Sequence, residues 1–289
     1  MNQAVQPEAA RPSAPAVIVR EVQGVLFATL NAPSTRNALA PEVVAALDAA
    51  VARAEADGAV RALVLRGAGG FFCAGGNVGN FRARLDAGPG GDDPVASRNR
   101  EFGYFMQRLA ALPVPVVAAV EGAAMGGGMG LACAADIVLA TRDARFALSE
   151  TTLGIIAAQI APFVVARIGA AATRRLGLSG ERASGDAAVA LGLADELAAD
   201  GAALDALLAE WLTRICRCGP QANRAFKPLV ARAARLPQGE ALDEAARLFA
   251  QCMRGEGAEG IQAFRDKRDA AWVARFDAAA VRAAQATQD

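Results

Sequence analysis

The chain has 289 residues, of which 54% are hydrophobic and 21% are charged. Its 30 basic and 30 acidic residues give a formal net charge of zero, so it presents no basic field for nucleic acid or an anionic membrane surface. It contains no histidine, which excludes Ser-His-Asp and Cys-His catalysis, histidine-ligated metals and imidazole acid–base chemistry. Proton transfer at neutral pH must then come from carboxylates, tyrosine, cysteine, lysine, water or the main chain.

The five cysteines are odd in number and form no CxxC pair, which predicts reduced thiols in a cytoplasmic protein. Cys216 and Cys218 alternate within RICRC, a pattern that we interpret as helix packing and not as half of a zinc site. Residues 1–15 lack the features of a signal peptide, and their Pro/Ala content predicts a disordered leader. No run of about 18 uncharged apolar residues predicts a membrane span.

The first half of the chain alternates between predicted strands and helices. Residues 16–22 and 25–31 predict an antiparallel hairpin around the turn at Gln23 and Gly24. Loops are predicted at 31–37 and 83–99, helices at 41–56 and 99–112, and buried strands at 61–67 and 116–120.

Beyond this point, two strands are predicted at 136–140 and 144–150, and helices at 160–177 and 184–192. From about residue 201 onward the pattern is wholly helical. We therefore divide the chain into a core at 16–200 and a helical region at 201–289. Strand–helix alternation followed by a helical region predicts the α/β class.

Two glycine clusters each follow a buried strand: Ala74-Gly75-Gly76-Asn77 and Gly126-Gly127-Gly128. Glycine allows close approach of the main chain to a ligand, and a helix N-terminus offers unpaired N–H groups. Two such turns that faced one point would form an oxyanion hole, although either alone is more typical of a tight connection. Dinucleotide binding fits poorly, since no acidic partner follows at βαβ spacing.

Together the motifs resemble the enoyl-CoA hydratase/isomerase, or crotonase, superfamily over roughly residues 16 to 275. The segments that carry the resemblance occur in the family's order: NAPSTRNAL (31–39), FFCAGGN (71–77), AAVEGAAMGGGMGLACAADIVLA (118–140), ARFALSETTLGI (144–155), LSGERASGDAAVALGLADE (178–196) and AFRDKRDAAW (263–272). The resemblance implies a crotonase-like spiral of ββα repeats with an α-helical C-terminal region. It also implies a homotrimer or a dimer of trimers, in which residues 201–289 serve oligomerisation and active-site closure.

The resemblance further implies that the main-chain N–H groups of Gly76 and Gly127 hold the thioester oxygen. Each such donor contributes about 3 kcal/mol of transition-state stabilisation. Glu150 occupies the position of a catalytic carboxylate, whose pKa we expect to rise on partial burial. The alternative for Glu150 is a surface glutamate. The family's second glutamate is absent, because Gly130 stands in its place.

The loop after Glu150 also departs from the family pattern. Ala157 to Phe163 replace the usual PGxGG loop; the Ala158 N–H is expected to hold a water. The Gln159 amide positions that water or a substrate carboxylate, or alternatively caps the following helix. This stretch resembles the isohexenylglutaconyl-CoA hydratases of acyclic terpene breakdown.

Contacts with coenzyme A are implied for Arg36 and Ala74, and for Phe264 and Lys267 of a neighbouring subunit. The alternatives are a packed aromatic ring and solvated charges. Gly79 replaces a common lysine, for which Arg82 or Arg84 are substitutes. Cys73 and Asn77 border the first turn; we interpret them as packing and turn-forming residues.

Two reactions are compatible with these residues. A hydratase would use Glu150 both to activate water and to protonate the α-carbon, and a Δ3,Δ2-enoyl-CoA isomerase would use it as a proton shuttle. A catalytically weak acyl-CoA-binding homologue is a third hypothesis. The resemblance implies no metal and no cofactor, since coenzyme A is part of the substrate, and acyl-CoA is the only partner besides further copies of the chain.

Overall fold

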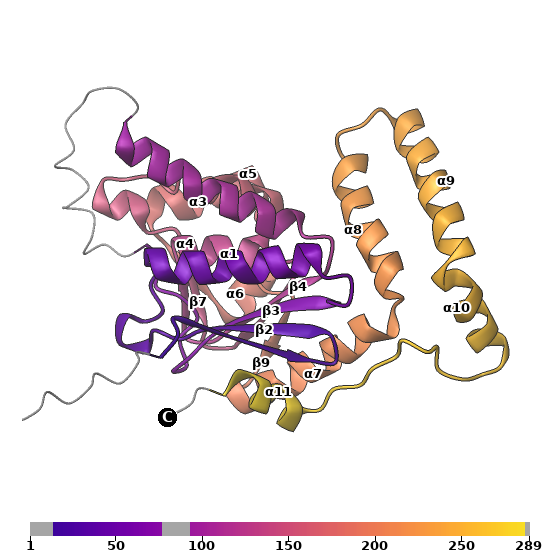
Figure 1. The fold of residues 1–289 in the computed structure, drawn as a ribbon. Coiled ribbons are helices and arrows are strands. Elements are labelled where there is room, and N and C mark those ends of the chain that lie inside the picture. Colours follow the sequence, from indigo (N-terminus) through magenta and orange to yellow (C-terminus); the bar gives the residue numbers. More distant parts are fainter. Residues whose placement is uncertain (1–13, 77–92, 287–289) are drawn as a thin grey trace, which may run out of the picture.

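A computed structural model of the chain describes residues 14–76 and 93–286, and it centres on a six-stranded sheet (Figure 1). The predicted leader lies outside this part, except for its last two residues. The strand order is β1-β2-β3-β4-β6-β9, with an antiparallel β1/β2 hairpin and parallel pairing elsewhere. The strands are β1 (Val17–Val22), β2 (Val25–Leu30), β3 (Ala62–Gly67), β4 (Val116–Val120), β6 (Ile137–Thr141) and β9 (Glu196–Ala198).

Helices cover both faces of this sheet, which explains why β2 and β4 are buried at every residue. Alternate residues enter two separate cores: Leu63 of β3 packs on one side, and its neighbour Val64 packs on the other. The helices that cover the first face are α1 (Pro41–Ala56), α3 (Pro94–Ala111), α4 (Gly127–Ala134) and α5 (Ala161–Ser179). The second face is covered by α7 (Gly201–Arg217) and α11 (Ala278–Gln285).

A small second sheet places the segments that matter for function. It joins β5 (Ala123–Met125), β7 (Arg145–Ala147) and β8 (Arg182–Ser184), with β5 and β7 parallel. Parallel strands end at the same edge, so the glycine turn after β5 and Glu150 after β7 are neighbours. The short helices around these sheets are η1 (Pro33–Thr35), η3 (Glu150–Leu153) and α6 (Gly185–Ala190).

The prediction of a loop up to residue 99 was wrong for its last part, because α3 already begins at Pro94. Asp93 is its N-cap: the Val95 N–H donates to the Asp93 carboxylate over 2.9 Å, and proline follows at the first helical position. Residues 77–92 of the predicted loop lie outside the described residues.

The C-terminal region is helical but interrupted, which corrects the prediction of a wholly helical segment. Residues 266–277 contain no helix; they lead the chain from α10 back to α11 along α7. Along this path Trp272 Nε1 donates to the Arg217 carbonyl (3.2 Å), and the Phe276 N–H donates to Thr213 Oγ1 (3.0 Å).

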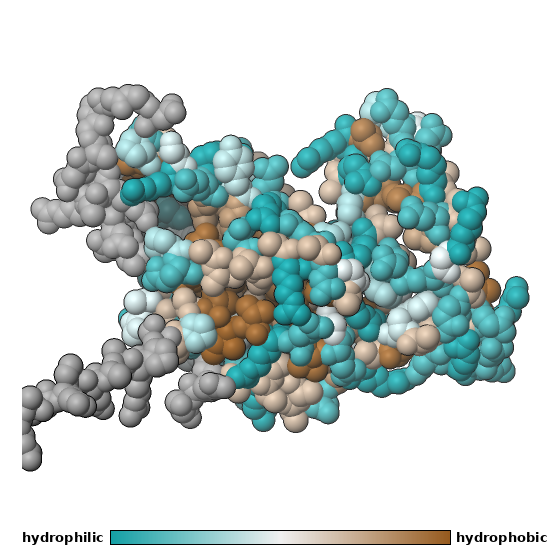
Figure 2. Space-filling view, viewed as in Figure 1, coloured by the Kyte–Doolittle hydropathy of each residue, from teal (hydrophilic) through white to brown (hydrophobic). Residues whose placement is uncertain are grey.

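Three helices of this region form an arm that stands away from the sheet (Figure 1): α8 (Pro220–Ala233), α9 (Gln238–Arg254) and α10 (Glu256–Arg265). Neither α8 nor α9 has a buried residue. The arm is fastened at its base by Arg224, whose Nη2 donates to the carbonyls of Ala54, Asp57 and Val60 at the end of α1. Figure 2 shows hydrophobic residues at the surface of the arm, between polar ones.

Across residues 14–76 and 93–286, no helix is long and apolar enough to cross a membrane.

Candidate active site

The first glycine turn follows β3 and is tied to β5 by main-chain hydrogen bonds. The Cys73 N–H donates to the Ala123 carbonyl (3.0 Å), and the Met125 N–H donates back to the Cys73 carbonyl (3.0 Å). On its other side the Gly75 carbonyl accepts from the Leu39 N–H (2.8 Å). Gly75 has a φ of 87°, which favours glycine. The turn is therefore fixed from both sides.

The second turn joins β5 to α4. Gly126 has a φ of 50° and a ψ of −118°, a conformation that side chains disfavour, and its N–H donates to the Ala147 carbonyl (2.8 Å). Gly127 is the first residue of α4, so its N–H has no partner within the helix. Among the described residues no acceptor takes this N–H.

The two turns touch each other. A Cβ built on Gly127 would lie 3.7 Å from the Gly75 Cα and 3.8 Å from the Gly76 nitrogen. A Cβ built on Gly75 would lie 2.5 Å from the Met125 carbonyl oxygen and 3.2 Å from the Gly127 nitrogen. A side chain at Gly75 would overlap the Met125 carbonyl and force the turns apart, whereas the distances from Gly127 to Gly75 and Gly76 are those of ordinary van der Waals contact. The glycine at position 75 therefore allows the two turns to come together.

Glu150 lies directly against the second turn. Its Oε1 is 2.7 Å from where a Cβ on Gly126 would be, so the absence of a side chain there makes room for the carboxylate. Glu150 is half-buried, and its Oε2 is buried with no hydrogen-bond partner among the described residues. Burial raises the pKa of Glu150 above its ordinary value. A partly desolvated carboxylate against the second glycine turn is thus suited to proton transfer.

At Gly130, the position of the family's second glutamate, the side chain of Ile160 packs against the helix. A Cβ on Gly130 would lie 2.3 Å from Ile160 Cγ2 and 3.6 Å from Met106 Cε, so even a methyl group does not fit without movement. Gly130 is buried within α4. Ile160 therefore occupies the space where a second carboxylate would need to stand.

The loop between Glu150 and α5 carries Ala158 and Gln159. The Ala158 N–H already donates to the Ile156 carbonyl (2.8 Å), so it would have to exchange this bond in order to hold a water. The alternative that Gln159 caps the next helix was wrong: the N-cap of α5 is Ile160, and no side chain caps it. Gln159 Nε2 instead donates to Asn99 Oδ1 on α3 (2.9 Å).

Arg36 borders the first turn. Its carbonyl accepts from the Ala74 N–H (2.9 Å), and its exposed guanidinium lies 5.9 Å from the centroid of the Phe71 ring. Arg36 and the half-buried Ala74 are thus neighbours at the first glycine turn, and their contact with coenzyme A stays a prediction.

Sequence reasoning missed Asn37, which holds this loop in place. Asn37 is fully buried; its Nδ2 donates to the carbonyls of Ala68 (3.0 Å) and Phe71 (2.5 Å), and its Oδ1 accepts from the Ala32 N–H (2.9 Å). Its φ of 54° is a conformation that asparagine tolerates better than most residues. The asparagine at the end of the predicted loop was therefore the available signal in the sequence.

Cys73 is a packing residue, as predicted. It is fully buried, and burial raises the pKa of its thiol to about 12, so it holds no thiolate at neutral pH.

Phe264 lies on α10 and Lys267 just after it, and α10 is on the side of the arm that faces away from the sheet (Figure 1). Phe264 is 84% exposed, and Lys267 is exposed with a φ of 54°. A single chain therefore does not bring these two residues to the glycine turns. Asn77, Gly79, Arg82 and Arg84 lie outside the described residues.

Known proteins resemble this chain over most of its length. The model of the family described as enoyl-CoA hydratase/isomerase matches residues 20–275. The Pseudomonas aeruginosa AtuE structure is 45% identical, with a TM-score of 0.86 over 90% of this chain and 100% of that one. An enoyl-CoA hydratase/isomerase from Marinobacter aquaeolei is 42% identical, with a TM-score of 0.86 over 90% and 99%. The 2,3-dehydroadipyl-CoA hydratase of Escherichia coli is 30% identical over 254 residues, which is 87% of this chain and 96% of that protein.

The α/β fold is that of the crotonase superfamily, as predicted. The chain belongs to the enoyl-CoA hydratase/isomerase family.

Proposed function

We propose that the chain is an enoyl-CoA hydratase, which adds water across the 2,3 double bond of an acyl-CoA thioester. The observation that carries this proposal is the Glu150 carboxylate, half-buried with one oxygen lacking a hydrogen-bond partner in the described structure. It lies against Gly126, whose neighbour Gly127 is in contact with the turn at Gly75 and Gly76.

The reaction needs one carboxylate and two amides. The Glu150 carboxylate takes a proton from water while the water oxygen bonds to C3, and the π electrons of the double bond move to give an enolate. The enolate oxygen accepts hydrogen bonds from the Gly76 and Gly127 N–H groups, which bind it more strongly than the neutral carbonyl. Protonated Glu150 then gives its proton to C2, so the carboxylate is regenerated and one water has been added.

A Δ3,Δ2-enoyl-CoA isomerase is the alternative. The packing of Ile160 on Gly130 favours it, since a second carboxylate has no room there and isomerisation requires only one base. Hydration remains the proposal because a single carboxylate can perform both of its proton transfers. A catalytically weak acyl-CoA-binding homologue is the third possibility.

The substrate that we propose carries a branched glutaconyl-type acyl group. The resemblance of the Ala157–Phe163 segment to isohexenylglutaconyl-CoA hydratases supports this, as does a relative named for a substrate with a second carboxylate. Arg36 and Ala74 would contact coenzyme A from the same chain, and no further cofactor enters the mechanism.

We also propose a homotrimer or dimer of trimers in the cytoplasm, in which residues 201–289 supply the contacts and help to close the site. The support is the arm itself: a neighbour's arm would bring Phe264 and Lys267 to a site that they do not reach in one chain.

The test is turnover of a panel of enoyl-CoA substrates by the wild-type protein and by Glu150→Gln. We expect a product heavier by one water, and a loss of kcat of about 100-fold or more in the variant with acyl-CoA affinity retained. The control is Glu42→Gln, at an exposed glutamate on α1. A product of unchanged mass identifies the isomerase, and turnover that survives Glu150→Gln contradicts both reactions.

A further inference from the structure

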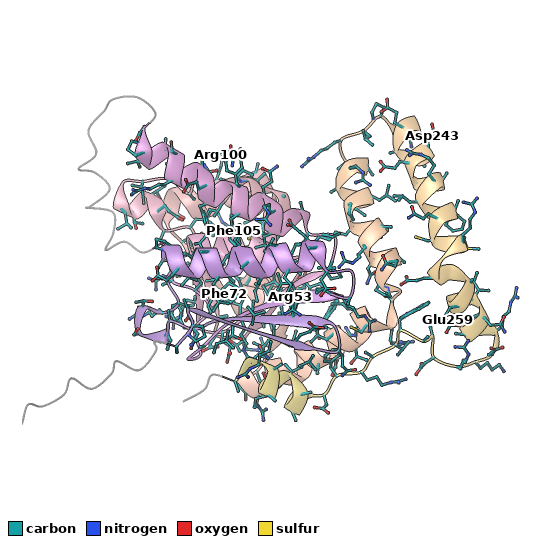
Figure 3. All side chains as sticks on the ribbon, viewed as in Figure 1. Arg53, Phe72, Arg100, Phe105, Asp243 and Glu259 are labelled. Atoms are coloured by element: carbon teal, nitrogen blue, oxygen red, sulfur yellow. The ribbon has the colours of Figure 1, made fainter. Side chains whose placement is uncertain are left out.

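The two main-chain segments that lead into the glycine turns form a short parallel ladder beyond the end of the large sheet. The Phe72 N–H donates to the Glu121 carbonyl (2.8 Å), and Cys73 exchanges main-chain hydrogen bonds with Ala123 and Met125. Phe72 is fully buried in the first core, below the ribbon of α1 in Figure 3. One side of the ladder runs into the first glycine turn and the other side into the second, so the start of the ladder influences where both turns lie.

Glu121 lies at the start of this ladder, and Arg66 holds its side chain. Arg66 of β3 is beside Ala119 of β4, and Glu121 follows Ala119 by two residues, so both side chains point to the same face. Arg66 Nε donates to Glu121 Oε2 (2.8 Å), and Arg66 Nη2 lies 2.6 Å from the same oxygen. The two side chains are only 11% and 17% exposed, so solvent screens this ion pair less than a surface pair.

Arg66 is itself fixed by the two helices that cover the second face of the sheet. Its Nη1 donates to Asp205 of α7 and to Gln285 Oε1 of α11 (3.3 Å). Arg282 of α11 donates through Nε to the other carboxylate oxygen of Asp205 (2.9 Å), and Asp205 is buried. The charges of this network therefore compensate one another, as partly buried charges require.

A glycine makes room for the Glu121 carboxylate. Gly201 is the first residue of α7, and a Cβ built on it would lie 2.3 Å from Glu121 Oε1. The carboxylate therefore lies against the N-terminus of a 17-residue helix, where the helix dipole stabilises a negative charge. Glu121 is thus held on one side by Arg66 and on the other by the end of α7.

We propose that Glu121 is a positioning residue, which together with Arg66 holds the ladder where the Gly76 and Gly127 N–H groups meet the thioester oxygen. This inference rests on the proposed function, because it assumes that these two amides stabilise the enolate. Glu121 acts through the main-chain hydrogen bonds of the ladder and not on the reacting atoms. Its loss should therefore weaken the binding of an enolate more than the binding of a neutral thioester.

The test compares two acyl-CoA ligands with acyl chains of equal length: acetoacetyl-CoA, which can bind as its enolate, and butyryl-CoA, whose thioester stays neutral. Calorimetry gives the two Kd values and ultraviolet absorbance reports the bound enolate, so neither readout depends on turnover. Removal of one oxyanion donor costs about 100- to 1,000-fold in kcat, and a displaced donor should cost part of this. We expect Glu121→Ala to lower the preference for acetoacetyl-CoA over butyryl-CoA about 10-fold or more. Glu121→Gln should restore most of it, because its amide oxygen can still accept from Arg66.

The matched control is Asp136→Ala, which removes another partly buried carboxylate. Asp136 accepts from the Val116 N–H (2.7 Å) and pairs with Lys227 (2.6 Å), at the opposite end of β4 from Glu121. Its loss should lower the stability of the protein and leave the preference for acetoacetyl-CoA unchanged.

Gly201→Ala is a second test variant, which keeps every charge of the network. Its methyl group overlaps the Glu121 carboxylate, so it should lower the preference for acetoacetyl-CoA in the same direction as Glu121→Ala. Alanine is also a better helix former than glycine, so this variant decides the question if Glu121→Ala does not fold.

A wild-type preference in either test variant overturns the inference, as does an equal fall in Asp136→Ala. Failure of the proposed function has a different signature: the wild-type protein itself then shows no preference for acetoacetyl-CoA and no enolate absorbance, which overturns both.

Discussion

At the scale of single residues, Glu150 determines how the proposed reaction responds to pH. Burial raises its pKa from the ordinary value of 4.5. Because the carboxylate must be ionised to take a proton from water, kcat/KM should fall as the pH decreases through this raised pKa. The pH profile of kcat/KM checks this: an acid limb at or below the ordinary pKa would contradict a buried base.

The same pKa shift has a consequence for stability. A carboxyl group whose folded-state pKa is raised favours folding below its unfolded pKa, and this contribution is lost as the pH rises through the folded pKa. Glu150→Gln should therefore unfold at a higher temperature than the wild-type protein at neutral pH, and the difference should vanish in acid. Calorimetry at both pH values measures it; a Tm that falls at neutral pH would indicate an undetected partner for the carboxylate.

At the scale of elements, the contact of α4 with the start of α5 sets the number of carboxylates in the site. Gly130→Ala should destabilise the protein by about 1–3 kcal/mol, because the added methyl group overlaps Ile160. In the double variant Gly130→Ala/Ile160→Ala the loss should be smaller than the sum of the single losses, because one change makes the space that the other fills. Denaturant unfolding of the four proteins tests this, and strictly additive losses would contradict the packing.

The helices and strands also show how much of the structure the sequence could predict. Local signals were sufficient for the β1/β2 hairpin and for α1, which spans 41–56 as predicted from Pro41. The start of α3 was predicted too late, because polar residues near its N-terminus resemble a loop and only Asp93 signals the cap.

The candidate site was predictable in its residue types and not in its contacts. The glycine turns and Glu150 were recognisable from motif and position. Their environment depends on residues distant in the chain: Ile160 against Gly130, and Gln159 against Gly103. Such contacts exist only once the helices have packed, so spacing alone could not reveal them.

At the scale of the whole molecule, the arm exposes three large aromatic side chains, which are typical of a protein–protein contact when they gather on one surface. Phe226, Phe249 and Phe264 are 65%, 68% and 84% exposed. We expect the protein to associate through this surface, so Phe249→Glu should lower the mass measured by analytical ultracentrifugation. Gln251→Glu on the same helix is the control. A monomeric wild-type protein at micromolar concentration would contradict the proposed assembly.

The most direct test of the central claim is a crystal structure of the protein with acetoacetyl-CoA. The account predicts that the thioester oxygen lies about 3 Å from the main-chain nitrogens of both Gly76 and Gly127, with the Glu150 carboxylate beside C2 of the acyl group. A thioester oxygen bound away from either amide, or a Glu150 side chain turned out of the site, would contradict it.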